Sequence, residues 1–348
     1  MMIGIHDKPG SFSDRWIEYC RTNGVSHKIV NCHATDIMSQ LRGCDALLWE
    51  WENLSHSDVL AGERVMRSAE AMGLRVFPDS ATCWHYDDKV AQKYLLEAVD
   101  AEMVPSYAFY SLDAALDWVN EATFPKVFKL ARGSGSLNVF LLRTREKAQK
   151  VCRQAFSRGF KPIAGLAGDF TTRIRKHRRK GDFFPLLKRL PATLASVIRF
   201  NRTISRERGY VYFQDFIPGN TTDTRVTIIG DRAFAFTRGV RPNDFRASGS
   251  GQINYDMSKI DSQCVEIAFE TVRRLKTQSL AFDFVKSQTG RPLIVEISYC
   301  YLADAVYACP GHWDAQMQWH EGPMWPQDAI LDDLLNELRA VRAVGVRS

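Results

Sequence analysis

The stretch between residues 210 and 251 most constrains the fold, because it alternates short apolar runs with tight Gly, Pro and Asn turns. This alternation is typical of antiparallel β-strands joined by short loops. Five charged residues along it stand out: Asp223, Arg225, Arg238, Arg241 and Arg246. Because a planar guanidinium pairs bidentately with phosphate or carboxylate, the set predicts a sheet that holds a multiply anionic ligand. For any single arginine of the set, the alternative is an ordinary solvated strand face.

The first 80 residues show a different pattern, in which strand-like apolar runs alternate with helical segments. Such an alternation predicts a parallel α/β layer with right-handed crossovers. No GxGxxG motif follows the first predicted strand, so we predict no dinucleotide site there. The turn at residues 6–14 either lends Lys8 and its backbone amides to a substrate or is a plain surface turn.

The 348-residue chain is long enough for two or three subdomains. No apolar run approaches the roughly 20 residues of a membrane-spanning helix, and the N-terminus lacks a signal pattern. We therefore expect a cytoplasmic protein. Its eight cysteines form no CxxC pair and its eight histidines form no HExxH motif. These spacings argue against a disulfide framework and against a zinc site.

A helix is predicted from Asp87, where two acids precede a periodic apolar run, and a strand, a helix and a hairpin follow. Lys129 ends the first strand of this hairpin, and Gly133 and Gly135 lie in the turn just after it. Glycines let a backbone approach a ligand closely, and the amides of such a loop can bind phosphate oxygens. The turn therefore predicts a phosphate site next to a lysine, unless it is only a turn.

Between Arg158 and Arg208 the chain carries fourteen Lys or Arg against three acids, a local charge of +11 in a protein of net charge +6. Within this insertion, basic residues flank an apolar helical pattern over residues 171–205. Such a segment can lie on an anionic membrane or close as a lid over a polyanionic substrate. A mobile solvated loop is the alternative. Nucleic acid is a weaker prediction, because neither a helix-turn-helix signature nor aromatics among the arginines are present.

A second hairpin is predicted near residues 281–299. The midpoint between Asp283 and Glu296 falls between Thr289 and Gly290, the expected tip of a two-residue loop. A regular hairpin would place the two carboxylates opposite each other, with Cβ atoms about 5 Å apart. The apolar neighbours would then point to the other face: Phe282, Phe284, Val295 and Ile297. Because like charges repel, we expect a cation between the acids, and oxygen ligands of this kind suit Mg²⁺. The alternatives are one protonated carboxyl or a neighbouring arginine that neutralises the pair.

Taken together, six motifs over residues 87–301 resemble the ATP-grasp superfamily. The resemblance assigns ATP-binding roles to Lys89, Lys129, the glycine loop Gly133, Ser134, Gly135 and Ser136, and the adenine hinge Gln214, Asp215, Phe216 and Ile217. It matches Asp223 and Arg225 to an Asp-x-Arg element, and Arg246 to a later arginine loop. It matches Asp283 and Glu296 to the metal strands. The family usually ends its second metal strand Glu-x-Asn, whereas position 298 is Ser, and the acidic ribose contact is not clearly placed.

The resemblance implies an α/β (α+β) ATP-grasp fold with ATP and Mg²⁺ as cofactors. We expect a Rossmann-like domain at 1–86, a small subdomain at 87–209 with the basic insertion at about 158–209, and a C-terminal subdomain at 210–348. The two later subdomains would hold ATP between them. Arg225 and Arg246 would bind the acyl phosphate or the substrate carboxylate, Arg238 the γ-phosphate, and Asp283, Glu296 and Ser298 the metal.

The implied reaction joins a small-molecule carboxylate to an amine through an acyl phosphate. The Trp-rich tail at 309–327 resembles ATP-grasp proteins of surface-polysaccharide biosynthesis, so a sugar or lipid-linked glycan precursor is the expected substrate. The tail aromatics would either stack on sugars or close the core. The alternatives are a peptide-type amino-acid ligase and a non-catalytic, nucleotide-gated binding protein that uses the basic insertion.

Overall fold

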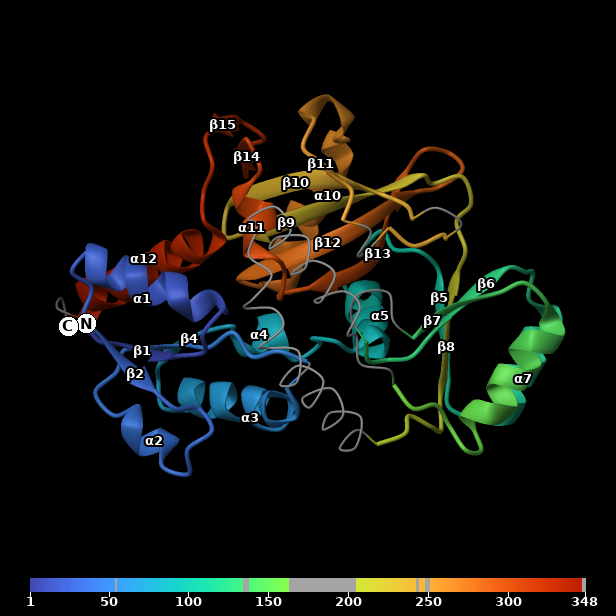
Figure 1. Ribbon diagram of the computed structural model, residues 1–348, viewed down its shortest axis with the longest axis horizontal. Coiled ribbons are helices and arrows are strands. Elements are labelled where there is room, and N and C mark those ends of the chain that lie inside the picture. Colours follow the sequence, from blue (N-terminus) through green and yellow to red (C-terminus); the bar gives the residue numbers. More distant parts are fainter. Residues whose placement is uncertain (54, 134–137, 163–204, 242–243, 248–250, 346–348) are drawn as a thin grey trace, which may run out of the picture.

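The computed structural model describes residues 1–53, 55–133, 138–162, 205–241, 244–247 and 251–345. Within these residues the chain forms three β-sheets, which Figure 1 shows arranged around a central helix, α5 (Lys89–Ala98). None of the described helices is both long and apolar enough to cross a bilayer. The predicted basic insertion lies largely outside the described residues.

The N-terminal sheet is parallel and has the strand order β2-β1-β3-β4, as the alternating sequence pattern predicts. Its elements are β1 Ile3–His6, α1 Phe12–Thr22, β2 His27–Val30, α2 Ile37–Gln40, β3 Ala46–Leu48, α3 His56–Ala71, β4 Arg75–Phe77 and α4 Ser80–Cys83. Polar side chains fix the helix starts: Ser11 accepts a hydrogen bond from the amide of Ser13 at α1, and Ser55 accepts one from the amide of Asp58 at α3.

The middle sheet is antiparallel, in the order β5-β8-β6-β7, and α6 and α7 share its core. Its strands are β5 Ser106–Phe109, β6 Lys126–Lys129, β7 Val139–Leu142 and β8 Val211–Asp215, with helices α6 Leu112–Glu121 and α7 Arg145–Ala155. The predicted hairpin is confirmed, because β6 pairs antiparallel with β7 and Lys129 lies opposite Val139 next to the turn. Strand β8 pairs with β5 and β6, so these five residues belong to the middle sheet although they follow the boundary expected at residue 209.

The large sheet has the order β13-β12-β9-β10-β14-β15, with β11 added beside β10. Its elements are β9 Thr222–Ile229, β10 Arg232–Gly239, β11 Ile253–Asn254, a 3-10 turn at Met257–Lys259, α10 Ser262–Leu275, β12 Ser279–Lys286, β13 Pro292–Ser298, α11 Ala303–Tyr307, β14 Gly311–Asp314, β15 Trp319–Glu321 and α12 Pro326–Gly345. The long antiparallel pairing of β9 with β10 confirms the strand pattern predicted for the 210–251 stretch.

The N-terminal and large sheets pack against each other through a common hydrophobic core. Side chains of both sheets meet in each of two apolar clusters, one around α3 and α10 and the other around α1 and α12. The C-terminal helix α12 lies beside α1 (Figure 1), where Trp16 Nε1 donates to the carbonyl of Gln327 at 3.1 Å. The apolar side chains buried in these two clusters hold the N-terminal and large sheets in a fixed orientation. Helix α5 lies between the large and middle sheets (Figure 1).

Candidate functional site

Two buried lysines lie where the middle sheet meets the large sheet. Lys89 is the first residue of α5, whose start is fixed because Asp88 accepts hydrogen bonds from the amides of Val90 and Ala91. Only 3% of Lys89 is exposed. Its Nζ donates to the carbonyl of Gly133 at 2.8 Å and pairs with Glu296 Oε1 at 3.2 Å. This lysine therefore joins the predicted glycine loop to the predicted metal strand.

The second lysine, Lys129, ends β6 and is 4% exposed. Its Nζ donates to Gln214 Oε1 at 2.6 Å, which brings together two residues predicted to bind the nucleotide. Burial lowers the pKa of Lys129 to about 8, with the neighbouring charge of Lys89 acting in the same direction and that of Glu296 against it. An anion arriving here would favour the charged form of Lys129.

The acids of the second hairpin face each other, as predicted: Asp283 on β12 pairs directly with Glu296 on β13. The prediction of a two-residue loop is wrong. The strands end at Lys286 and Pro292, so the loop has five residues, and a bulge between Asp283 and Phe284 restores the acid pairing by shifting the register. The bulge also leaves Val295 only half-buried. The other predicted core residues are buried: Phe282, Phe284 and Ile297.

Two arginines converge on Asp283. Arg225 donates Nε and Nη2 to its two carboxylate oxygens at 2.7 and 2.8 Å, and Arg238 Nη2 lies 2.8 Å from Oδ2. Arg238 also binds Asp223 bidentately at 2.8 and 2.5 Å. Although burial opposes it, the charges of Arg225 and Arg238 hold the pKa of Asp283 well below its usual range. The structure thus shows the arginine-neutralised form of the acid pair, which the sequence left as an alternative.

The third predicted catalytic arginine has a different partner. Arg246 binds the nearby carboxylate of Asp244, with Nε and Nη2 at 2.7 to 3.0 Å from its oxygens. Phe245 next to it contacts the ring of Phe216 from the predicted hinge, at a centroid distance of 5.9 Å. Arg246 therefore lies by the hinge, but no contact described here places it on Asp283 with the other two arginines.

The predicted hinge residues are only partly available to a ligand. The Asp215 side chain pairs with Lys126 at 2.5 Å, and its backbone N–H donates to the carbonyl of Pro105 at 2.9 Å. Gln214 Nε2 donates to Ser106 Oγ at 3.1 Å, which fixes the amide that Lys129 binds. The loop residues Ser134, Gly135 and Ser136 lie outside the described residues.

Sequence reasoning missed Asp87, directly before the cap of α5. It adopts a left-handed backbone conformation, with φ of 54°, and its Oδ1 accepts the N–H of Gly133 at 3.0 Å. Burial raises the pKa of Asp87 to about 6, against the charge of Lys89. The available signal is the double acid before Lys89, which predicts the start of a helix but not a contact with Gly133.

The donors suit Mg²⁺ in part. Asp283 and Glu296 are adjacent carboxylates on neighbouring strands, and Mg²⁺ typically takes one or two carboxylates together with substrate phosphates. Ser298 shares this face of β13, but its hydroxyl donates to the carbonyl of Cys300 at 2.9 Å and accepts its N–H at 3.2 Å. Among the described residues no group of three or more His, Cys, Asp and Glu side chains is arranged to hold a metal. Substrate phosphates are the further oxygen ligands that Mg²⁺ typically takes beside one or two carboxylates.

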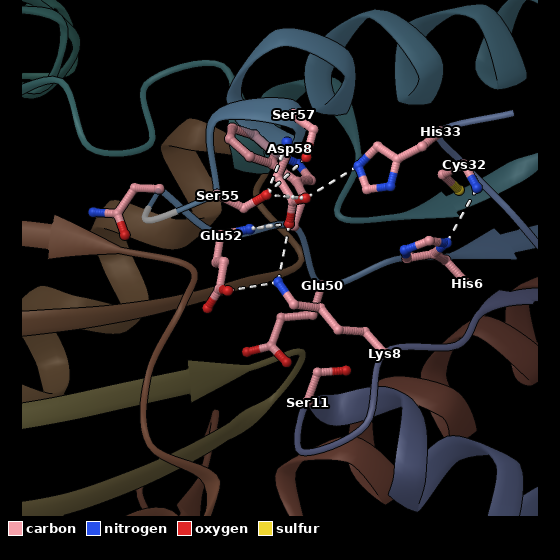
Figure 2. Close-up of polar contacts among 12 residues, drawn as sticks. His6, Lys8, Ser11, Cys32, His33, Glu50, Glu52, Ser55, Ser57 and Asp58 are labelled. Atoms are coloured by element: carbon pink, nitrogen blue, oxygen red, sulfur yellow. Dashed lines mark hydrogen bonds and ion pairs between the residues drawn. The ribbon is translucent and has the colours of Figure 1, made fainter. Parts of the chain in front are cut away.

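A second polar cluster lies at the carboxyl edge of the N-terminal sheet and is drawn in Figure 2. Lys8 Nζ binds Glu52 at 2.6 Å and Asp58 at 3.1 Å, and His33 Nε2 lies 3.1 Å from Asp58. Glu50 Oε2 accepts the N–H of Phe12 at 2.6 Å. Of this cluster, the sequence pointed only to Lys8, as a candidate substrate contact.

Comparison with known proteins gives the fold but no closer relative. No protein-family model matches the sequence, and no curated protein matches it either. The structure is similar to a solved D-cycloserine synthetase, with a TM-score of 0.56 and 15% identity over 96% of this chain and 99% of that one. It is also similar to the D-alanine–D-alanine ligase of Bacillus anthracis complexed with ATP, with a TM-score of 0.55 and 13% identity over 98% of each chain.

A third similar structure names the fold in its description. It is a RimK domain ATP-grasp protein from Sphaerobacter thermophilus, with a TM-score of 0.52 and 16% identity over 88% of this chain and 94% of that one. At sequence identities this low, the similarity shows a shared fold and not a shared function. Since these three likenesses each extend over most of both chains, the chain has the ATP-grasp fold that its motifs predicted.

Proposed function

We propose that the protein is an ATP-dependent carboxylate–amine ligase that forms an amide through an acyl phosphate. One observation carries this proposal: Lys89, Lys129 and the paired acids Asp283 and Glu296 converge between two sheets, beside the carbonyl of Gly133. Cations that surround a transferring phosphoryl group, and positioning in place of a protein nucleophile, are what phosphoryl transfer requires. The ligases of similar fold, one of them complexed with ATP, support the same assignment.

In this proposal Lys89 and Lys129 bind the triphosphate, and Gln214 holds Lys129 at the edge of the adenine pocket. Asp283 and Glu296 would hold Mg²⁺, which when bound neutralises charge on the phosphate oxygens. For this, Asp283 would release one of its two arginines. Arg225 or Arg238 would then be free to bind the substrate carboxylate or the phosphoryl oxygens. The same guanidinium group would thus pair with Asp283 before the substrate binds and with the substrate afterwards.

The substrate we propose is a sugar or lipid-linked glycan precursor. The Trp-rich tail supports it, because Trp313 and Trp319 line an open cavity of about 370 Å³ together with Met257, Pro310 and Glu321. Their rings meet edge to face at 4.9 Å and offer apolar surface on which a sugar can stack. A cytoplasmic enzyme that contacts the membrane through residues 171–205 fits this substrate. A peptide-type ligase remains the second candidate, favoured by the likeness to a D-alanine–D-alanine ligase.

ADP release tests the ligase. Purified protein is given Mg-ATP, a panel of uronic and amino acids, and hydroxylamine, which traps acyl phosphates as hydroxamates. We expect ADP and hydroxamate to appear together, and only with an accepted acid. If ATP binds but no acid elicits ADP or hydroxamate, the protein is a nucleotide-gated binder and the ligase proposal is wrong. Amino acids compared with amino-sugar nucleotides as the amine then separate the glycan-modifying enzyme from the peptide-type one.

A further inference from the structure

Glu50 lies where the N-terminal sheet meets the segment that follows the candidate metal strand. It comes two residues after β3, at the carboxyl edge of the parallel sheet, where open α/β sheets bind their ligands. One carboxylate oxygen accepts the N–H of Phe12, the first residue of α1, at 2.6 Å. The other lies 3.6 Å from the thiol of Cys300, which donates to it. Glu50 therefore contacts the N-terminal α/β layer through Phe12 and the segment after β13 through Cys300.

The path from Glu50 to the candidate metal site is short. Cys300 turns back onto Ser298, as its N–H and carbonyl both bind the Ser298 hydroxyl. Ser298 lies two residues beyond Glu296 on the same face of β13, which is about 7 Å along a strand. Ser298 and Cys300 therefore link the strand of Glu296 to the carboxylate of Glu50 through direct contacts.

The charges around Glu50 favour a cation. The ammonium of Lys8 is already bound by Glu52 and Asp58 (Figure 2), and Glu50 itself accepts the N–H of Phe12 at the N-terminus of α1. Burial, together with the neighbouring ring of His33, lowers the pKa of His6. The cluster thus places three carboxylates, of Glu50, Glu52 and Asp58, around the one ammonium of Lys8, with the imidazole of His33 beside Asp58. Glu52 is the solvent-accessible member, with 43% of its side chain exposed.

We propose that Glu50 is the catalytic residue that accepts the proton of the amine substrate, which enters as an ammonium between Glu50 and Glu52. The inference rests on the proposed ligase function. One ammonium proton passes to the Glu50 carboxylate, and the freed nitrogen lone pair attacks the acyl carbon. The bond from that carbon to the phosphate oxygen then breaks, and phosphate leaves with the electron pair and takes the second nitrogen proton. Amide and inorganic phosphate result, and Glu50 returns its proton to water.

The protonation behaviour of Glu50 fits this role. Burial, assisted by the negative charge of Glu52, raises the pKa of Glu50 to about 7, while the amide of Phe12, the thiol of Cys300 and Lys8 act against the rise. Two further ionisable groups interact with Glu50 from the same segment as Cys300: the phenols of Tyr299 and Tyr301. An acid that ionises near neutral pH can both take and release a proton during turnover.

Glu50→Gln tests the inference, with Glu63→Gln on the outer face of α3 as the matched control. The acid is first identified with hydroxylamine, which is mostly uncharged at neutral pH and needs no base. Amino acids and amino sugars are then supplied as amines. For Glu50→Gln we expect amide formation at pH 7 to fall about 100-fold or more, while hydroxamate formation stays near wild type. The amide rate of the wild type should rise through pH 7, and Glu50→Asp should restore part of both the rate and this rise.

Three results would overturn the inference. Glu50→Gln could keep the wild-type amide rate and pH profile, or it could lose amide and hydroxamate formation equally, which would indicate a structural role. The wild type could also make hydroxamate but no amide with any of the amines. Failure of the ligase proposal looks different, because the wild-type protein would then give no hydroxamate at all.

Discussion

Replacing Asp283 by Asn should destabilise the protein far more than the matching change at Glu296. Asp283 neutralises two guanidinium groups through three contacts of 2.7 to 2.8 Å, and it is almost fully buried. After the change Arg238 still forms its bidentate ion pair with Asp223, but Arg225 loses the carboxylate that both of its nitrogens bind. Breaking a buried ion pair by removing one partner costs about 3–5 kcal/mol in the free energy of unfolding.

Glu296→Gln should cost less. A third of the Glu296 side chain is exposed, and Lys89 keeps its hydrogen bond to the carbonyl of Gly133. For a part-exposed charged hydrogen bond of this kind we expect about 1–2 kcal/mol. Asp113→Asn, an exposed acid in the first turn of α6, serves as the control and should change stability by less than about 1 kcal/mol.

Equilibrium unfolding in urea, followed by tryptophan fluorescence, measures the difference. With a slope of about 3 kcal/mol per molar urea, Asp283→Asn should lower the midpoint by roughly 1 M or more, and Glu296→Gln by about half that or less. Equal midpoints for the two variants would refute the reasoning. They would mean that the two arginines do not depend on Asp283, and that the ion-pair network around it contributes nothing specific to stability.

Two further predictions concern the site and its scaffold. Because Lys129 has a pKa of about 8, binding of a non-hydrolysable ATP analogue at pH 8 should take up about half a proton and weaken as pH rises further. Titration calorimetry in buffers of different ionisation enthalpy measures this, and Lys129→Met should take up none. Gly62→Ala should cost about 1–3 kcal/mol, since a Cβ there would lie 2.5 Å from the ring of Trp51. An unchanged thermal midpoint would show that α3 can move away.

The order of strands and helices was predictable because hydrophobic periodicity is a local signal. Asp283 and Glu296 face each other in either of two arrangements that suit their odd separation: a loop with an even number of residues, or an odd-numbered loop with one bulge. The loop was not predictable, because a two-residue loop without a bulge and a five-residue loop with one give the same pairing. Only the packing of β13 decides between them.

The ion pairs of the site could not be derived from the sequence. Arg225 and Asp283 are 58 residues apart and meet because β9 pairs with β12, which no local pattern specifies. The same holds for β8, whose apolar residues fit either sheet until its pairing with β5 and β6 is known. Glu50 gave no signal, because its contact with Cys300 joins residues that lie 250 positions apart along the chain.

The central claim is that Lys129 and the acid pair together bind a metal-bound triphosphate. Calorimetric titration with a non-hydrolysable ATP analogue, with Mg²⁺ and then with EDTA, tests it most directly on wild type, Lys129→Met and Glu296→Gln. We predict tight binding only for the wild type with Mg²⁺, a large loss for Lys129→Met in both conditions, and loss of the Mg²⁺ effect for Glu296→Gln. Equal affinity with and without Mg²⁺ in the wild type, or unchanged binding by Lys129→Met, would contradict the account.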